Sequence, residues 1–511
     1  MNAMSPAEAP LDMLIVGAGI SGIGMAAKLT MQCPGKRYLM LDRRGELGGT
    51  WDLFRYPGIR SDSDMHTFAY QFAPWNQEET IASAEQIKDY LRGVVESHGI
   101  RDKMRFGRQV ESADWDSKAG LWRVIARQAD ETAETITARF LFLGTGYYDY
   151  DKPYDAEIPG IAKFKGEVIH PQFWPEDFDC TGKQVVIIGS GATAVSVVPA
   201  MAEKASHVTM LQRTPTWYGI RPRLDSFASS MRRWLPAKWA WTINRARALR
   251  MHEFLFRRAR SRPEEFGAIL KNMVREALGE AWNEADYTPP YNPWEQRLCL
   301  VPDGDMFAVI RERRASVVTG EIESVTANGI TLTDRRKLAA DVIVTATGLR
   351  IATLGKIRVS LDGAPIDPAQ HFWYRNCMFS NVPNLAVLFG YLNAGWTLRV
   401  DLVTDWLTRL LVQMDAWKVD IAIPVLPNDH DLVDSQPLDL LSSGYLQRGK
   451  HLVPKSSTKA PWRINMNYRE DKAELAAAPI DDGVLRFERI FTSHSLSTPA
   501  QPELVEIPAL T

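Results

Sequence analysis

Cysteine is scarce in this sequence of 511 residues. The four cysteines, Cys33, Cys180, Cys299 and Cys377, are far apart in the sequence and form no C-x-x-C motif. Redox catalysis by a dithiol needs two close thiols, and a disulfide framework needs paired cysteines at short spacings. The pattern argues against both, and it favours four buried, reduced thiols.

Long apolar runs and a strong charge of either sign are also absent. No run of about 18 apolar residues occurs, so we predict no membrane-spanning helix. Residues 1–10 lack the apolar core of a signal peptide, which favours a cytoplasmic location. The formal net charge of −2 argues against nucleic acid as a partner, because phosphate binding needs a basic excess. With 45% hydrophobic residues, the chain is typical of a globular protein of two or three domains.

A glycine-rich turn stands near the start of the chain, between an apolar run at residues 13–16 and a helical stretch. Gly17, Gly19 and Gly22 have the spacing that permits a tight turn, close approach of a pyrophosphate and close packing of the helix on the strand. The next apolar strand ends at Asp42, 20 residues after Gly22, where a carboxylate accepts hydrogen bonds from a ribose diol. These features predict a dinucleotide-binding βαβ unit.

A second βαβ unit begins with the apolar strand at residues 184–188. Its turn supplies Gly189, Gly191, Thr193 and Ala194. The second strand of this unit runs not into an acid but into Arg213 and Thr214. One interpretation of Arg213 is a solvated surface residue. We favour the other, in which Arg213 pairs with the 2′-phosphate that an acid would repel, and this predicts NADPH rather than NADH.

Two such units in one chain predict an α/β protein with two Rossmann-like dinucleotide-binding domains, one for FAD and one for NADP. A flavin beside its reductant explains the pairing, because flavin reacts with O2 as no side chain does. Apolar strands run into small-residue turns at 144–146 and 346–348, which we interpret as crossings between the domains. The predicted domains are residues 1–146 with 346–511 for FAD and residues 147–345 for NADP, with a helical insert over about 220–295.

Further motifs resemble those of Baeyer–Villiger monooxygenases. Residues 48–51 (Gly-Gly-Thr-Trp), residues 56–58 (Tyr-Pro-Gly) and Asp62 are similar to the flavin-side motif of that family. The family's fingerprint is matched at every defining position by Phe164, Gly166, His170, Trp174 and Pro175. Longer segments resemble the ethionamide-activating subgroup, namely residues 54–65, 291–302 and 460–468.

The resemblance implies an FAD- and NADPH-dependent enzyme, without a metal, that inserts one oxygen atom of O2 beside the carbonyl of a small ketone. The product would be an ester or lactone, formed through a peroxide at C4a of the flavin. Oxidation of thioethers at sulfur would be a side activity. Two alternatives are a flavin monooxygenase that acts only on nitrogen or sulfur and a non-oxygenating NADPH-binding redox sensor. The complete fingerprint argues against the first.

The resemblance also assigns roles to single residues. Arg297 lies where the family keeps an arginine that stabilises the peroxide, and Asp62 lies where it keeps a carboxylate beside that arginine. Gln296 replaces a lysine that contacts the cofactor phosphate in many members, which leaves Arg213 as the main residue for the 2′-phosphate. Trp462 matches a tryptophan near the nicotinamide ribose. The predicted cofactor contacts of the flavin-side motif are Gly49, Thr50 and Trp51.

Histidine and tryptophan in these motifs have structural as well as functional interpretations. His170 is either a hinge contact that moves as NADP changes position or a hydrogen-bonded structural histidine. Packing is favoured over catalysis for three tryptophans, Trp51, Trp174 and Trp294.

Residues 226–262 form a basic segment with ten Lys or Arg and one acid, Glu253. Three tryptophans interleave with these charges, at Trp234, Trp239 and Trp241. Basic amphipathic sequence can lie on an anionic membrane surface, so weak peripheral membrane association is one hypothesis. The alternative, which the sequence favours, is a helical cap over the mouth of the substrate site with a solvated face.

Replacement of Arg297 by alanine is predicted to uncouple the enzyme. A guanidinium keeps its proton at any working pH, so Arg297 would stabilise an anion that a buried site disfavours. Hydride transfer needs only stacked rings, so Arg297→Ala should still oxidise NADPH and consume O2 while releasing hydrogen peroxide in place of ester. Asp62→Ala should show a milder loss. NADPH oxidation and product are measured together with bound FAD confirmed, and coupling at the wild-type ratio would contradict the assignment.

Overall fold

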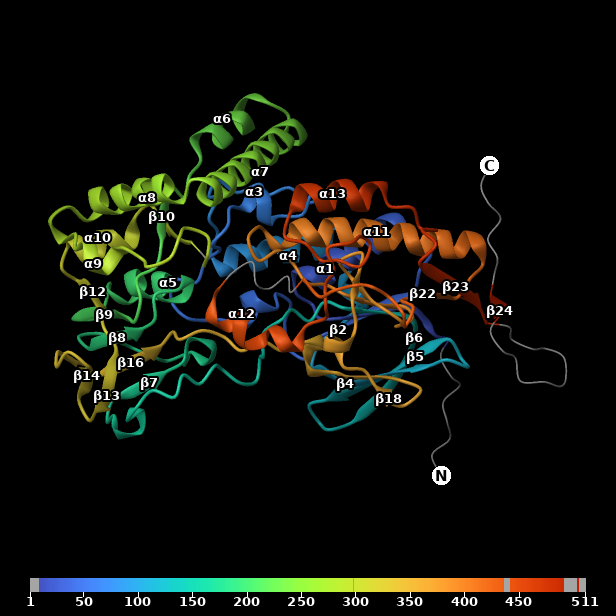
Figure 1. The fold of residues 1–511 in the computed structure, drawn as a ribbon, viewed down its shortest axis with the longest axis horizontal. Helices are drawn as coiled ribbons and strands as arrows, with labels where there is room; N and C mark the ends of the chain where they lie inside the picture. Colours follow the sequence, from blue (N-terminus) through green and yellow to red (C-terminus); the bar gives the residue numbers. More distant parts are fainter. Residues whose placement is uncertain (1–8, 297, 436–441, 491–502, 505–511) are drawn as a thin grey trace.

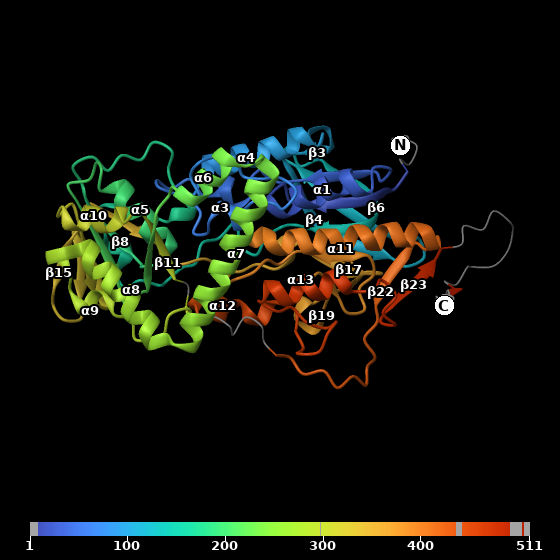
Figure 2. The same cartoon turned by 90° about the horizontal axis from the view of Figure 1, so that it is seen from above.

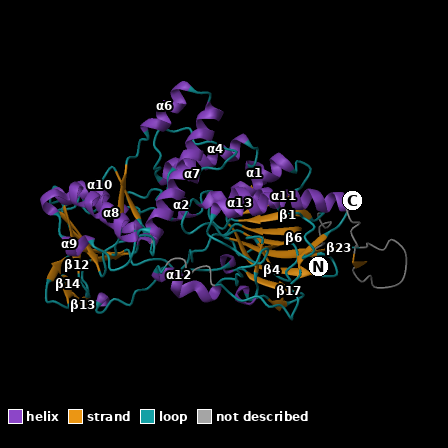
Figure 3. Cartoon of the chain, turned by 45° about the horizontal axis from the view of Figure 1, so that its top comes forward, coloured by secondary structure: helices purple, strands orange, loops and turns teal. Residues whose placement is uncertain are grey.

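The computed structural model of the chain describes residues 9–296, 298–435, 442–490 and 503–504. Arg297, to which the sequence assigns a catalytic role, lies outside the described residues. Two separate groups of strands, with helices packed around them, make up the molecule (Figure 1, Figure 3). Within the described ranges, no helix has both the length and the apolar character needed to cross a membrane.

The first sheet has nine strands in the described part of the chain, in the order β18-β17-β4-β5-β6-β1-β2-β3, with β21 beside β6. Their bounds are β1 (Leu11–Val16), β2 (Tyr38–Leu41), β3 (Met104–Arg105), β4 (Arg108–Asp116), β5 (Leu121–Gln128), β6 (Ala133–Leu143), β17 (Arg358–Leu361), β18 (Ala364–Pro365) and β21 (Leu385–Val387). The helices of this half are α1 (Ile20–Gln32), α2 (Thr50–Leu53), α3 (Met65–Phe68), α4 (Ala84–Ser97), α11 (Trp396–Trp417), α12 (Gly444–Gly449) and α13 (Tyr468–Ala477). Short strands complete it, namely β19 (Trp373–Tyr374), β20 (Met378–Phe379), β22 (Ile421–Pro424), β23 (Leu485–Arg489) and β24 (Glu503–Leu504).

Three parallel strands of this sheet end side by side. β1 lies between β2 and β6 and is parallel to both. Val16 is in register with Leu41 on one side and with Leu143 on the other, so the carboxyl ends of the strands meet at one edge. All three residues are buried, as expected for a parallel sheet with both faces covered. Ligands of open α/β sheets bind at this kind of edge.

The second sheet is parallel throughout and repeats this plan. Its order is β12 (Ala315–Thr319), β9 (His207–Gln212), β8 (Gln184–Ile188), β16 (Val342–Thr345) and β7 (Glu167–Ile169). Two helices, α5 (Ala192–Met201) and α10 (Asp305–Arg311), accompany it. A small antiparallel sheet adds β13 (Ile322–Thr326), β14 (Gly329–Leu332) and β15 (Lys337–Ala339). The predicted α/β class with two Rossmann-like domains is confirmed.

A group of helices separates β10 (Tyr218–Arg221) from its parallel partner β11 (Cys299–Pro302). The helices are α6 (Ser226–Trp234), α7 (Ala237–Ser261), α8 (Pro263–Leu278) and α9 (Glu284–Tyr287). Seen from above, α7 runs from the second sheet's side of the molecule toward α11 (Figure 2).

A buried arginine anchors α7 to the first half of the chain. Arg245 donates through Nη1 to the carbonyl oxygens of His66, at 2.9 Å, and Ala69, at 2.7 Å. Its Nη2 donates to Asp401 Oδ2 on α11 at 3.0 Å, and both side chains of this pair are buried. A buried charge without its partner is strongly disfavoured, so this pair constrains where the insert lies.

Candidate functional site

One cavity of about 1110 Å³ extends past both glycine-rich turns. Its walls come from the carboxyl ends of β1 and β2 in the first sheet and of β8 and β9 in the second. Among the described residues that the sequence assigns to a site, its lining includes Gly17, Gly19, Asp42, Gly49, Thr50, Trp51, Asp62, Gly189, Gly191, Thr193, Arg213, Thr214 and Gln296. Residues from the two predicted nucleotide sites therefore share one continuous space.

The first turn has no room for side chains at Gly17 and Gly22. Gly17 has a φ of +104°, and a Cβ there would lie 2.6 Å from the carbonyl oxygen of Gly144. A Cβ on Gly22 would lie 1.9 Å from the carbonyl oxygen of Gly17. Gly19 precedes α1 without a side-chain cap, so the first N–H groups of this helix are available to an anion in the cavity.

Asp42 holds the turn from the end of β2. Its Oδ2 accepts from the backbone N–H of Ala18 at 2.7 Å, and its Oδ1 accepts from that of Arg44 at 2.8 Å. Burial raises the pKa of the Asp42 carboxyl, and the two backbone hydrogen bonds oppose that rise. A carboxylate accepts about four hydrogen bonds, so Asp42 keeps capacity for a ribose diol in the cavity that it lines.

The second turn follows the same rules and is more open. Gly189 has a φ of +130°, and a Cβ there would lie 2.3 Å from the carbonyl oxygen of Ala346. Gly191 precedes α5 without a side-chain cap, and a Cβ on it would meet no atom within 4 Å. Ala194 is buried beneath the turn against the sheet. Arg213 is exposed and lines the cavity, where its charge is accessible to a phosphate.

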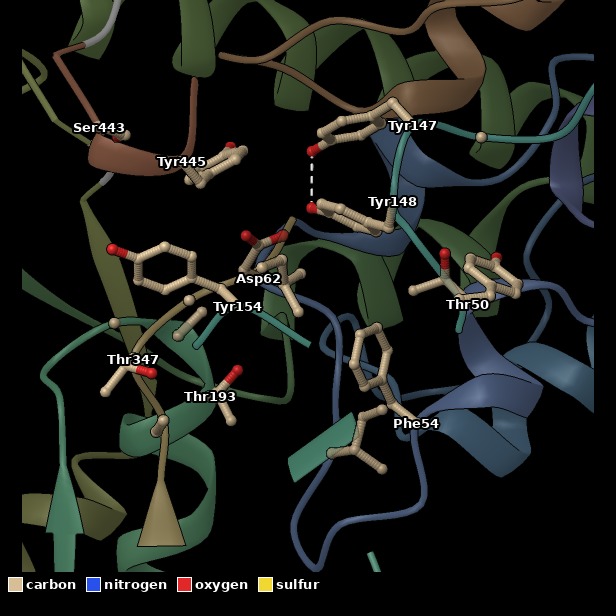
Figure 4. A pocket seen from close by; sticks show the side chains of 18 of the residues that line it. Thr50, Phe54, Asp62, Tyr147, Tyr148, Tyr154, Thr193, Thr347, Ser443 and Tyr445 are labelled. Carbon is tan, nitrogen blue, oxygen red and sulfur yellow. Dashed lines mark hydrogen bonds between the residues drawn. The ribbon is translucent and has the colours of Figure 1, made fainter. Parts of the chain in front are cut away.

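Aromatic residues that the sequence did not single out form another wall of the cavity (Figure 4). The hydroxyls of Tyr147 and Tyr148 share a hydrogen bond of 2.6 Å. The guanidinium of Arg448 stacks 3.5 Å from the centre of the Tyr154 ring. Figure 4 shows Asp62 in the space between Tyr154 and Tyr148. The only sequence signal for these tyrosines is that they follow the turn at 144–146.

The fingerprint residues lie outside the cavity lining and serve the crossing between the sheets. A Cβ on Gly166 would lie 2.2 Å from the carbonyl oxygen of Asp341, so glycine allows β7 to lie beside β16. Phe164 packs against the core beneath the second sheet. His170 Nδ1 accepts from the backbone N–H of Gln172 at 3.2 Å. Burial lowers the pKa of His170, and a backbone contact with Gly348 opposes that shift.

The tryptophans occupy different surroundings. Trp51 lines the cavity and makes an edge contact with Phe68 at 5.7 Å between ring centres. Trp174 packs on Phe178 at 5.5 Å. Trp462 does not line the cavity: it is 6% exposed and packs against Tyr374 in the core, at 5.5 Å between ring centres. The structure thus places Trp462 apart from the other predicted cofactor residues.

Curated relatives match this chain over nearly its whole length. A probable FAD-binding monooxygenase, AlmA, from an Acinetobacter species is 44% identical over 484 residues, which are 94% of this chain and 97% of the relative. The FAD-containing monooxygenase EthA of Mycobacterium tuberculosis is 42% identical over 481 residues, which are 94% of this chain and 98% of the relative.

Solved structures share the fold at lower sequence identity. A steroid monooxygenase solved in the oxidised state with NADP has a TM-score of 0.74 and 21% identity, with 94% of this chain and 99% of that one covered. A cyclohexanone monooxygenase bound to epsilon-caprolactone has a TM-score of 0.70 and 21% identity, with the same coverage.

A family model described as pyridine nucleotide-disulphide oxidoreductase matches residues 14–233. All four cysteines of this chain are free and buried, so the match reflects nucleotide binding and not dithiol chemistry.

Gly22→Ala is predicted to lower FAD affinity by roughly 5- to 150-fold, because overpacking of this kind costs about 1–3 kcal/mol and opens the turn. Bound flavin is measured by absorbance after purification and again after reconstitution with FAD. Gly93→Ala on α4 is the matched control, since a Cβ there would meet no atom within 4 Å. Full flavin content in Gly22→Ala at an unchanged melting temperature would contradict the assignment of this turn.

Arg213→Ala is predicted to weaken the binding of NADPH by roughly 10- to 150-fold and to leave the binding of NADH nearly unchanged. A charge-assisted contact contributes about 1.5–3 kcal/mol, and only NADPH has the 2′-phosphate. KM for both cofactors is compared with that of Arg335→Ala, whose side chain is 83% exposed and lies outside the cavity lining. An equal rise in KM for NADPH and for NADH would indicate that Arg213 is a structural residue.

Gln296→Lys should strengthen the preference for NADPH over NADH.

Proposed function

Because this chain belongs to the family of FAD-containing monooxygenases, we propose that it is a Baeyer–Villiger monooxygenase that uses NADPH. In the proposed reaction, a ketone, O2, NADPH and a proton give an ester or lactone, water and NADP⁺. One oxygen atom of O2 enters beside the carbonyl and the other leaves as water. Thioethers are side substrates, oxidised at sulfur.

A single observation carries the proposal, namely the one cavity lined by both glycine-rich turns. Two separate pockets would favour independent nucleotide binding. A shared space instead permits a nicotinamide to reach a flavin without either nucleotide leaving the protein, which hydride transfer requires.

The residues of the first turn fit FAD. Gly17 and Gly22 allow the close backbone packing of the turn, Gly19 lines the cavity, and the uncapped start of α1 suits a pyrophosphate. Asp42 would accept from the adenosine ribose, and Gly49 and Thr50 would contact the nucleotide from the start of α2. Bound there, FAD supplies hydride acceptance and reaction with O2, which no side chain provides.

The second turn would hold NADPH in the same manner. Gly189 and Gly191 leave the pyrophosphate access to the start of α5, and Arg213 would pair with the 2′-phosphate. Gln296, where many members of the resembled family have lysine, would donate a neutral hydrogen bond. Recognition of the 2′-phosphate therefore rests mainly on one cation.

The polar side chains between the two turns would position the substrate. Asp62, which by the family resemblance would lie beside Arg297, lines the cavity. The paired hydroxyls of Tyr147 and Tyr148 offer a proton donor and an acceptor, and the Tyr147 ring beneath them is buried. Their rings, with Trp396 stacked on Tyr147 at 5.3 Å, make this wall apolar, so it excludes water and accepts a hydrophobic ketone.

A panel of linear, cyclic and aryl ketones tests the proposal against its alternatives. Holoenzyme is expected to consume NADPH and O2 in equal amounts and to form one ester or lactone per NADPH with at least one ketone. Products are identified by mass spectrometry, and thioethers and tertiary amines are run beside the ketones. Turnover of thioethers or amines with no ketone oxidised would favour the nitrogen- and sulfur-oxidising alternative. NADPH binding without O2 uptake would favour the redox sensor.

A further inference from the structure

The helices α6 and α7 form a hairpin that projects from the body of the molecule (Figure 1, Figure 3). Large apolar side chains on it are exposed where an isolated soluble protein would bury them. Trp234 is 76% exposed, Trp239 64% and Phe254 57%, with Phe227 and Ile243 also exposed. We call these five residues the hairpin surface. Several large apolar side chains exposed on one projecting hairpin are typical of an interaction site.

The residues of α7 share one face of the helix. Trp239, Ile243, Arg250 and Phe254 are spaced by four, seven and four residues, which places them along one stripe of an α-helix. Trp241 and Arg245 lie on the opposite, buried side and contact the body of the protein. The hairpin is thus held by one face and presents the other to solvent.

Four cations of the segment that contains this hairpin form no hydrogen bond or ion pair with the described residues, and one of them, Arg233, lies over the ring of Trp234. Of the ten basic residues at 226–262, six bond to groups of the protein itself, namely Arg232, Arg245, Arg247, Arg257, Arg258 and Arg262. The other four have no hydrogen bond or ion pair to the described residues, namely Arg233, Lys238, Arg250 and Arg260. The segment's single acid, Glu253, pairs with Arg257. The charged side chains of residues 226–262 that form no ion pair are therefore all positive.

The exposed tryptophans and the unpaired cations favour an anionic lipid surface over a second copy of the chain as the binding partner. A second copy docked by a two-fold axis would place these cations against their own counterparts, which like-charge repulsion disfavours. An anionic lipid surface instead offers phosphates to Arg233, Lys238 and Arg250. It also offers an interfacial layer in which tryptophan is favoured, because its ring is apolar and its N–H is polar.

We propose that the hairpin surface docks the holoenzyme on an anionic lipid bilayer, with Trp234 and Trp239 at the level of the headgroups. The sequence alone favoured a solvated face here, and the exposure of these tryptophans changes that balance. The proposal stands apart from the oxygenation reaction, since no residue of α6 or α7 lines the cavity.

Vesicle flotation of the full-length holoenzyme tests this proposal. Wild-type protein should float with phosphatidylcholine vesicles that contain about a third phosphatidylglycerol, and much less with phosphatidylcholine alone. The variants are Trp234→Ser with Trp239→Ser, and Arg233→Gln with Lys238→Gln. Each cation removed should lower the partition coefficient by about fivefold, and raised salt should lower it further. Controls are Val412→Ser on α11, 50% exposed, and Arg335→Gln, away from the hairpin.

Support requires loss of flotation in both hairpin variants, normal flotation in both controls and unchanged NADPH oxidation in solution. Equal recovery of wild-type protein from neutral and anionic vesicles would overturn the proposal. A dimer in light scattering that Trp234→Ser with Trp239→Ser abolishes, with no vesicle bound, would also overturn it and assign the surface to a second copy.

Discussion

Two close contacts between backbone segments organise this protein, and neither leaves space for a Cβ atom. Gly17 and Gly189 follow the first strand of each dinucleotide-binding unit, and both have positive φ. Gly17 lies against the carbonyl of Gly144, and Gly189 lies against that of Ala346. Residues 144–146 lead from the first sheet toward the second, and residues 346–348 lead back. Each glycine-rich turn therefore packs against a segment that connects the two sheets, and both turns line the same cavity.

The fingerprint residues lie away from the cavity, at the point where the chain enters the second sheet. Gly166 sets the approach of β7 to β16, and His170 caps the short turn that follows β7 by accepting a hydrogen bond from the backbone N–H of Gln172.

The strands and turns of both units could be predicted from the sequence, because buried parallel strands read as short apolar runs and the turns that follow need glycine. The tyrosine wall could not, since Tyr147, Tyr148 and Tyr154 lie in loops without periodicity, and Tyr154 meets Arg448 only through the fold. The place of Trp462 in the core escaped prediction for a similar reason: a tryptophan suits a core and a cofactor site equally well. The contact between α7 and α11 depends on the buried ion pair of Arg245 and Asp401. These residues are far apart in sequence, so no local pattern predicts the pair.

Anaerobic mixing of the FAD-loaded protein with one equivalent of NADPH tests the shared cavity most directly. If the two turns hold a flavin and a nicotinamide in contact, the yellow flavin absorbance should bleach in a single first-order phase without any ketone. NADH should bleach it more slowly at the same concentration. A flavin that dithionite reduces and NADPH does not, in protein shown to bind NADPH, would contradict the account.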